Sequence, residues 1–157
     1  MLLYILVRFR NIGSSLGAIA AIFHDVLIVF SLYSILWGIV PFELSIDQAF
    51  IAAILTVVGY SINDTVVVFD RVREFLGLNK HEKDVAPVIN KAINTTLSRT
   101  LITSLTTLLV ILILFIFGGE GLKGFTFALL IGVAVGTYSS ICIATPIVVD
   151  YMKKFGK

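Results

Sequence analysis

The chain has 157 residues, of which 58% are hydrophobic and 14% are charged, and its formal net charge is +2. A soluble globular domain has about 45–50% apolar and about 25% charged residues, so this composition excludes an ordinary soluble domain. The small net charge argues against nucleic acid as a partner. The single cysteine, Cys142, can form neither an intrachain disulfide nor a cysteine metal cluster.

Long stretches without charged residues predict an all-α, polytopic helical membrane protein. A membrane-spanning helix needs roughly 20 mostly apolar residues, so the chain has room for about four spans. We predict a single transmembrane helical domain over residues 1–157, with spans at about 14–39, 47–70, 100–118 and 124–149. Residues 1–10 are predicted to be the stub of a further helix. Their seven leading apolar residues would form a helix only about 10 Å long, which is too short to span a membrane.

Residues 71–99 are predicted to form a loop between the second and third spans. From Val85 to Leu97, apolar residues recur at helical spacing, with polar residues on the other side. This pattern predicts an amphipathic helix that lies on the membrane surface.

The basic residues predict how the spans are oriented. All Lys and Arg residues except Lys123 fall on one side of the predicted topology, the side of residues 71–99 and the C-terminus. Because basic residues near the ends of spans are retained in the cytoplasm, we predict that the C-terminus is cytoplasmic.

Asp64 is the strongest candidate for chemistry. It lies in the second predicted span, about six residues, or roughly 9 Å, inside Asp70. A carboxylate at that depth is costly unless it faces protein or water. Asp64 is therefore either a proton-carrying acid or a hydrogen-bonded acid that fixes helix packing, and the residue type favours the first interpretation.

Arg99, just before the third span, has two interpretations. It can extend its charge to the membrane surface, or it can serve as a counter-charge for Asp64. Thr103 and Thr106 share a helix face with Arg99, and Thr107 lies on an overlapping stripe of threonines. Such hydroxyls can bind a neighbouring helix or hold water beside a titrating acid.

A second polar pair, His24-Asp25, lies inside the first full span. It is either a second titrating pair or a hydrogen-bonded strut between helices. The glycines Gly59, Gly132 and Gly136 are predicted to mark surfaces of close helix packing.

Motifs of covalent or metal chemistry are absent from the sequence. It contains no phosphate-binding glycine loop that ends in Lys-Ser/Thr and no His-Glu-x-x-His motif. We therefore expect no metal, no cofactor and no enzyme of covalent chemistry.

Several segments together closely resemble the SecF family of the bacterial SecD–SecF protein-export machinery. They are residues 59–71, 94–100 and 103–107, with Val7–Arg10, His24-Asp25, Gly118-Gly119, Gly124-Phe125 and residues 136–140. The resemblance implies a membrane subunit of the resistance–nodulation–division type that pairs with SecD in the lipid bilayer of the bacterial inner membrane. It further implies that the pair acts with the SecYEG translocon and uses the proton gradient to help export preproteins.

The family's membrane acid matches Asp64, and its essential arginine matches Arg99. This match favours a proton-coupling role for both residues. A supporting polar network is expected from neighbouring residues in the matched segments, namely Asn63, Thr65, Ser98, Thr103, Thr106 and Thr107. By the same resemblance, the chain begins near the inner end of the family's second span, so contact with preproteins is expected through segments that are missing here.

Three alternatives remain open at this stage. A different proton-driven exporter of the same superfamily would share the membrane acid but move lipids or small molecules. A structural membrane subunit would tolerate loss of Asp64. An intramembrane hydrolase would need a nucleophile or metal beside His24-Asp25.

Overall fold

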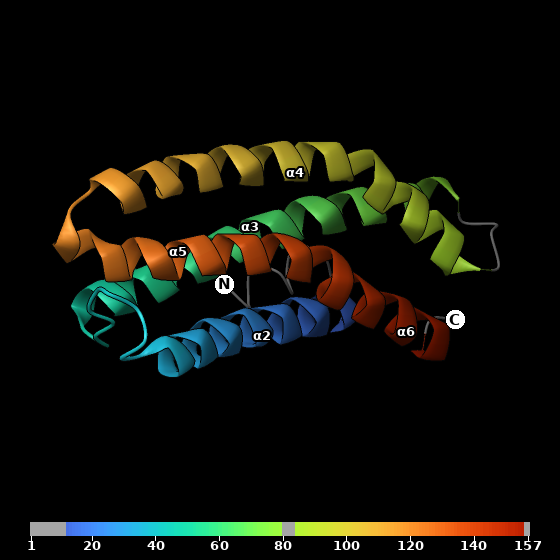
Figure 1. Ribbon diagram of the computed structural model, residues 1–157. Coiled ribbons are helices and arrows are strands. Elements are labelled where there is room, and N and C mark those ends of the chain that lie inside the picture. The colour runs from blue at the N-terminus through green and yellow to red at the C-terminus, as the bar shows by residue number, and fades with distance from the viewer. Residues whose placement is uncertain (1–11, 80–83, 156–157) are drawn as a thin grey trace.

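The computed structural model describes residues 12–79 and 84–155, which are almost entirely helical. The elements are α2 (Ile12–Leu36), α3 (Gln48–Leu78), α4 (Val85–Phe117), α5 (Glu120–Ser139), a π-helical segment η1 (Ser140–Ala144) and α6 (Thr145–Phe155). Because α5, η1 and α6 follow one another directly, four long helical units result (Figure 1). Each is long and apolar enough to cross a membrane, which confirms the predicted all-α fold with four spans. The predicted stub at residues 1–10 lies outside the described residues.

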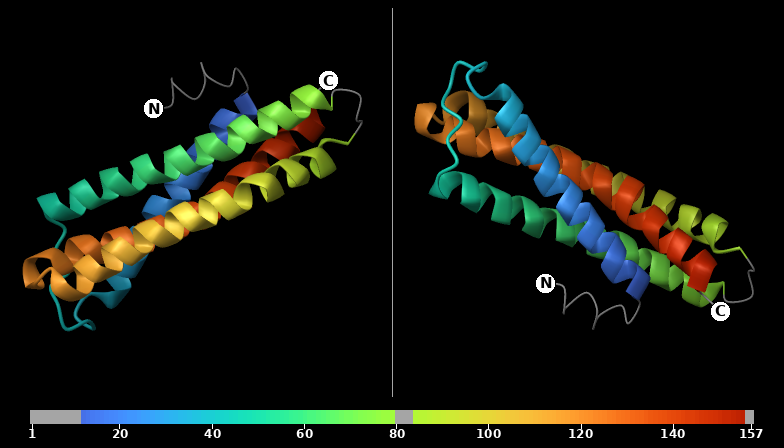
Figure 2. Two further views of the ribbon diagram at one scale, coloured as in Figure 1. Left: turned by 90° about the horizontal axis from the view of Figure 1, so that it is seen from above. Right: turned by 90° about the horizontal axis from the view of Figure 1, so that it is seen from below.

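The four units form a bundle in which α3 and α5 are the central pair. Figures 1 and 2 show α4 on one side of this pair and α2 on the other. Successive helices run in opposite directions, so α3 and α5 are parallel to each other and antiparallel to α2 and α4. Near the start of α5, the Tyr33 hydroxyl of α2 donates a hydrogen bond to the Gly124 carbonyl at 2.5 Å.

The basic side chains gather at one end of the bundle. This end, called the basic end below, is where α3 ends, α4 begins and α6 ends (Figure 1). Its described basic residues are Arg71, Arg73, Lys91, Lys153 and Lys154. Arg8, Arg10, Lys80, Lys83 and Lys157 lie outside the described residues.

The segment between the second and third spans differs from the prediction. The predicted amphipathic stretch is helical, but it is not a separate helix, because it forms the first part of α4 without a break. Its apolar face, including Ile89 and Ala92, is buried against Val68 and Val72 of α3. The physical reason is that α3 continues past its predicted end at residue 70 to Leu78 and offers a protein surface to this face.

The parallel pair α3 and α5 pack in a regular register. Gly132 faces Val57, Gly136 faces Ser61, and the Ser140 hydroxyl accepts a hydrogen bond from Thr65, each pair with the same separation of 75 residues. At Gly132 the Val57 side chain occupies the space that a Cβ would take. Small residues at this contact allow the two backbones to approach closely. Gly59 is different: among the described residues, no atom of a neighbouring segment lies within 4 Å of where its Cβ would be.

The last span is interrupted where Pro146 removes a backbone donor. A proline inside a helix cannot donate the usual hydrogen bond and clashes with the carbonyl four residues earlier. The helix responds with the π segment η1, and the Thr145 hydroxyl donates to the Ser140 carbonyl at 2.9 Å. Figure 1 shows the axis bending at this point.

Gly132→Ala is expected to destabilise the bundle by about 1–3 kcal/mol, because the added methyl group overpacks the contact with Val57. Gly59→Ala, in the facing helix, is the matched control. It should be neutral or stabilising by up to about 1 kcal/mol, since alanine favours the helix and nothing is displaced. Equilibrium unfolding by SDS in mixed micelles, followed by circular dichroism, measures both values. Equal effects of the two substitutions would contradict close packing at Gly132.

Candidate functional site

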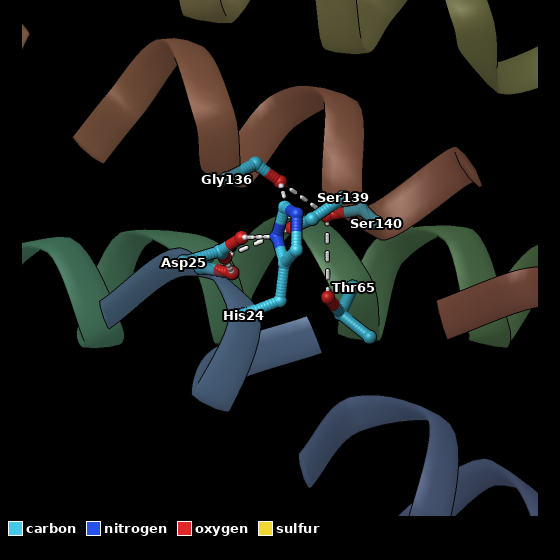
Figure 3. A network of polar contacts seen from close by, with 7 residues as sticks. His24, Asp25, Thr65, Gly136, Ser139 and Ser140 are labelled. Atoms are coloured by element: carbon cyan, nitrogen blue, oxygen red, sulfur yellow. Dashed lines mark hydrogen bonds and ion pairs between the residues drawn. The ribbon is translucent and has the colours of Figure 1, made fainter. Parts of the chain in front are cut away.

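Asp25 of α2 is buried at the junction of three helices. Its side chain is 1% exposed. The Oδ2 atom accepts hydrogen bonds from the Ser61 hydroxyl of α3 at 2.6 Å and the Ser139 hydroxyl of α5 at 2.8 Å. The Nδ1 atom of His24 lies 3.1 Å from Oδ1 (Figure 3). This geometry is that of a hydrogen-bonded strut between α2, α3 and α5.

A second contact continues this network along α3 and α5. The Thr65 hydroxyl donates to the Ser140 hydroxyl at 3.2 Å, and Ser140 donates to the Gly136 carbonyl at 2.8 Å (Figure 3). Thr65 was expected to support Asp64. Its hydroxyl instead lies on the face of α3 that contacts α5 and bonds to Ser140. The reason is that neighbouring residues on a helix point in different directions.

Asp64 lies on the other face of α3, towards α4. Its side chain is 6% exposed, and its Oδ2 atom accepts a hydrogen bond from the Ser104 hydroxyl at 3.4 Å. Ser104 in turn accepts hydrogen bonds from Thr137 of α5 at 2.7 Å and from the Tyr60 hydroxyl at 3.4 Å. The carboxyl group is therefore linked to both α4 and α5 through one serine.

The two buried carboxyl groups are satisfied to very different degrees. Asp25 has two short bonds from hydroxyl groups and a histidine nitrogen beside it. Asp64 has one long bond. An ionised carboxylate has room for about four hydrogen-bond donors, and a buried one with few donors is strongly penalised. Of the two buried carboxyl groups, Asp64 is the one with fewer hydrogen-bond donors around it.

Arg99 of α4 lies about one helical turn from the level of Asp64. The hydrogen bonds from Tyr60 to Ser104 and from Arg71 to Thr95 fix the antiparallel register of α3 and α4 and bring Arg99 opposite Val67. Arg99 is exposed on the surface of the bundle at this level. Within residues 12–79 and 84–155, the two side chains form no direct ion pair.

The other residues expected to support Asp64 do not reach it in this structure. Asn63 and Ser98 are exposed on the surface of the bundle. The hydroxyls of three threonines bond instead to backbone carbonyls of their own helix, namely Thr103, Thr106 and Thr107. Threonine in a helix commonly bonds to the carbonyl three or four residues earlier, which is the reason for the difference.

The hydroxyl groups that do bond to the two acids are not among the residues predicted to support them. Ser61 and Ser139 donate to Asp25, and Ser104 donates to Asp64. Thr137 and Tyr60 donate in turn to Ser104. Ser104 and Thr137 come from segments that matched the family, but only the register between helices brings them to Asp64. Over the described residues, no group of three or more His, Cys, Asp or Glu side chains could hold a metal ion.

The fold and the buried acids define a polytopic helical membrane protein with ionisable groups inside the bundle. The family model described as "Protein export membrane protein SecD/SecF, C-terminal" matches residues 1–154, and the chain belongs to this family.

Its relatives include proteins named protein translocase subunit SecF. The one from Rhodothermus marinus is 60% identical over 147 residues, which are 94% of this chain and 47% of that protein. The one from Vibrio alginolyticus is 46% identical over 146 residues, which are 92% of this chain and 44% of that protein. The chain therefore spans about half the length of these relatives.

Solved structures of SecDF have the same fold. The crystal structure of SecDF in its super-membrane-facing form aligns with 98% of this chain and 20% of that chain, at a TM-score of 0.88 and 46% identity. The structure of SecDF from Thermus thermophilus, titled a translocon-associated membrane protein, aligns with 97% of this chain and 20% of that chain, at a TM-score of 0.85 and 47% identity.

Asp25→Ala is expected to destabilise the bundle by about 1–3 kcal/mol, because it leaves buried hydroxyls without their acceptor. Asp25→Asn keeps an acceptor oxygen, so it should lower the free energy of unfolding by less than about 1 kcal/mol. Unfolding by SDS in mixed micelles measures both. Ser31→Ala is the control, since the Ser31 hydroxyl is exposed and bonds only within α2. A loss for Asp25→Ala no greater than that for Ser31→Ala would exclude the strut.

Proposed function

We propose that this chain is the proton-coupling membrane part of a SecF-type protein-translocase subunit. In this proposal it works with SecD and the SecYEG translocon and uses the proton gradient to assist preprotein export. The observation that carries the proposal is the contrast between Asp25, which has several hydrogen-bond partners, and Asp64, which has one long bond. The family relation supplies the translocase context.

Asp64 is the group that gains and loses the proton. When it is protonated, it is neutral and suits an apolar environment with few donors. When it is ionised, the positive charge of Arg99 attracts it, and the Ser104 hydroxyl donates to it. The two states therefore favour different positions of α4 relative to α3, and a ligand that binds one state better shifts the equilibrium towards it.

The membrane potential supplies enough energy for this shift. Moving one charge through 100 mV is worth about 2.3 kcal/mol, which is comparable to the gap between two conformations of a membrane bundle. Ser104 connects the site to α5 through Thr137, so a displacement of α4 reaches the central pair directly.

The orientation follows from the basic end, which we assign to the cytoplasmic face of the bacterial inner membrane. The C-terminus lies on that face. Protons enter Asp64 from the opposite side and leave towards the basic end.

Asp64→Asn is expected to abolish the gradient-stimulated part of preprotein export and to leave export without a gradient unchanged, because an amide cannot alternate its charge. The measurement is export into membrane vesicles that contain SecD, SecYEG and this chain, with and without a proton gradient. Asp150→Asn, an exposed acid-to-amide change in α6, is the control. Full stimulation in Asp64→Asn with SecD still bound would contradict the proposal. Stimulated transport of lipids or small molecules in place of preproteins would point to the related exporter class.

Arg99→Gln should lower gradient-stimulated export by about tenfold or more, because it removes a charge interaction of roughly 2 kcal/mol across about one helical turn. Arg99→Lys retains the charge and should keep a larger part of the stimulation. The same vesicle assay compares the two variants. Equal activity of Arg99→Gln and wild type would exclude a counter-charge role and leave Arg99 as an ordinary residue at the membrane surface.

A further inference from the structure

A cavity lies at the end of the bundle opposite the basic end. There, the segment between α2 and α3 (cyan in Figure 1) crosses from one helix to the other. This segment and the last turn of α2 border a space of about 360 Å³, in which Tyr33 and Leu44 are the buried lining residues. Small-molecule sites in proteins have volumes of about 300–1,000 Å³, so the space suits a compact group of atoms.

Contacts with the rest of the bundle fix the walls of this cavity. The Tyr33 hydroxyl donates to the Gly124 carbonyl of α5, and the Tyr33 ring lies 4.4 Å from the Phe50 ring of α3, measured between centroids. Asp47 caps α3 by accepting a hydrogen bond from the backbone N–H of Phe50 at 2.9 Å. The cavity is therefore part of the packed structure and is not an opening in a loose loop.

Three polar side chains line the cavity and are available to a ligand. They are those of Ser34, Glu43 and Ser45. All three residues are exposed, and none of their side chains forms a hydrogen bond or an ion pair within residues 12–79 and 84–155. The cavity therefore offers one carboxylate and two hydroxyl oxygens that can accept hydrogen bonds.

The charges at this end of the bundle favour a cationic ligand. Among the other charged residues described here, Asp47 is occupied as the cap of α3, and Glu120 pairs with Lys123 at 2.5 Å. The carboxylate of Glu43 has no such partner, and none of the described residues that line the cavity is basic. A cation would compensate the charge of Glu43, whereas an anion would be repelled.

An exposed apolar stripe of α2, called the α2 stripe below, leads to the cavity. Phe23, Leu27 and Phe30 are 66%, 48% and 39% exposed, and their spacing of four and three residues places them on one face of the helix. The same spacing continues to Ser34 and Trp37, which line the cavity. The eleven residues from Phe23 to Ser34 rise about 16 Å, which is roughly the thickness of one hydrocarbon leaflet. A lipid chain that follows the stripe therefore places its head group at the cavity.

Trp37 marks the level at which such a head group would lie. Its side chain is 76% exposed. Tryptophan is enriched where the hydrocarbon of a membrane meets water, and the face of its ring attracts cations. A cationic head group in the cavity would thus meet both the Trp37 ring and the Glu43 carboxylate.

We propose that this cavity binds the head group of phosphatidylethanolamine, with an acyl chain of the lipid along the α2 stripe. The primary ammonium group of this lipid has three N–H donors, which match the Glu43 carboxylate and the Ser34 and Ser45 hydroxyls. Phosphatidylcholine has a cation without N–H donors, and phosphatidylglycerol has no cation. The site involves no proton transfer, so it is independent of the proposed role of Asp64.

Lipid binding to the complete complex with SecD tests the chemistry of the site. The complex is purified in detergent, and native mass spectrometry measures its affinity for phosphatidylethanolamine and for phosphatidylcholine with the same acyl chains. Phosphatidylethanolamine should bind at least roughly tenfold more tightly, because its ammonium group forms charge-assisted hydrogen bonds and a methylated one does not. Equal affinities for the two lipids would overturn the proposal.

Glu43→Gln should remove most of this preference, because it takes away the charge that holds the ammonium group. Glu120→Gln is the matched control, since it is an acid-to-amide change at the same end of the bundle but outside the cavity. The control should retain the preference. Equal effects of the two substitutions would mean that the lipid responds only to the overall charge, and would overturn the site.

Cross-linking tests whether the lipid lies on the α2 stripe. The probe is phosphatidylethanolamine with a diazirine in one acyl chain, added to the same complex. Peptide mapping should find adducts on residues 23–37, which excess unlabelled phosphatidylethanolamine displaces and phosphatidylcholine does not. Glu43→Gln should reduce these adducts. Adducts only on other segments, or none on α2 because a protein segment covers the stripe, would overturn the proposal.

Discussion

A carboxyl group inside a membrane bundle must find its hydrogen-bond partners within the protein, and the contact between α3 and α5 makes this possible here. α3 carries Ser61 on the face towards Asp25 and Asp64 on the face towards α4. α5 carries Ser139 for the first acid and Thr137, through Ser104, for the second. The α3–α5 pair therefore lies between two polar sites, one around Asp25 and one around Asp64. Close approach at Gly132 and Gly136 brings these short hydroxyl side chains within reach.

Asp25 and Asp64, on either side of the α3–α5 pair, have different environments. Asp25 is held by donors from two other helices, so a change in its protonation would disturb the junction of three helices. Asp64 has one long bond, from Ser104, and forms no direct ion pair among the described residues. In the proposed function, the first acid maintains the framework against which the second one moves α4. Stability and coupling then reside in separate carboxyl groups.

Much of the fold could be predicted from the sequence because hydrocarbon excludes charge. The runs without charged residues located the four spans, and the depth of Asp64 identified it as exceptional. Span ends were less accurate, since hydropathy carries no signal for a helix that continues beyond the membrane, as α3 does to Leu78. The apolar stripe near Ile89 was assigned to the membrane surface for the same reason, although α3 covers it.

The partners of the acids could not be predicted because they depend on the register between helices. Thr103, Thr106 and Thr107 had the right spacing for a network, but each hydroxyl bonds within its own helix. Ser104, one position beyond Thr103, faces inward and reaches Asp64. A difference of one residue along α4 is a rotation of about 100°, and a single sequence does not establish which face turns towards α3.

The π segment has a consequence for how this region can vary. A line of every fourth residue runs from Gly132 through Gly136 and Ser140 to Ala144 and Val148, and it faces first α3 and then the buried cluster shared with α2. In a regular α-helix of 3.6 residues per turn such a line drifts around the axis, and the wider turn of η1 compensates for part of this drift. Loss of one residue here would rotate everything beyond it by about 100°. An insertion or deletion in this stretch would therefore displace every contact beyond it, whereas a substitution acts at its own contact.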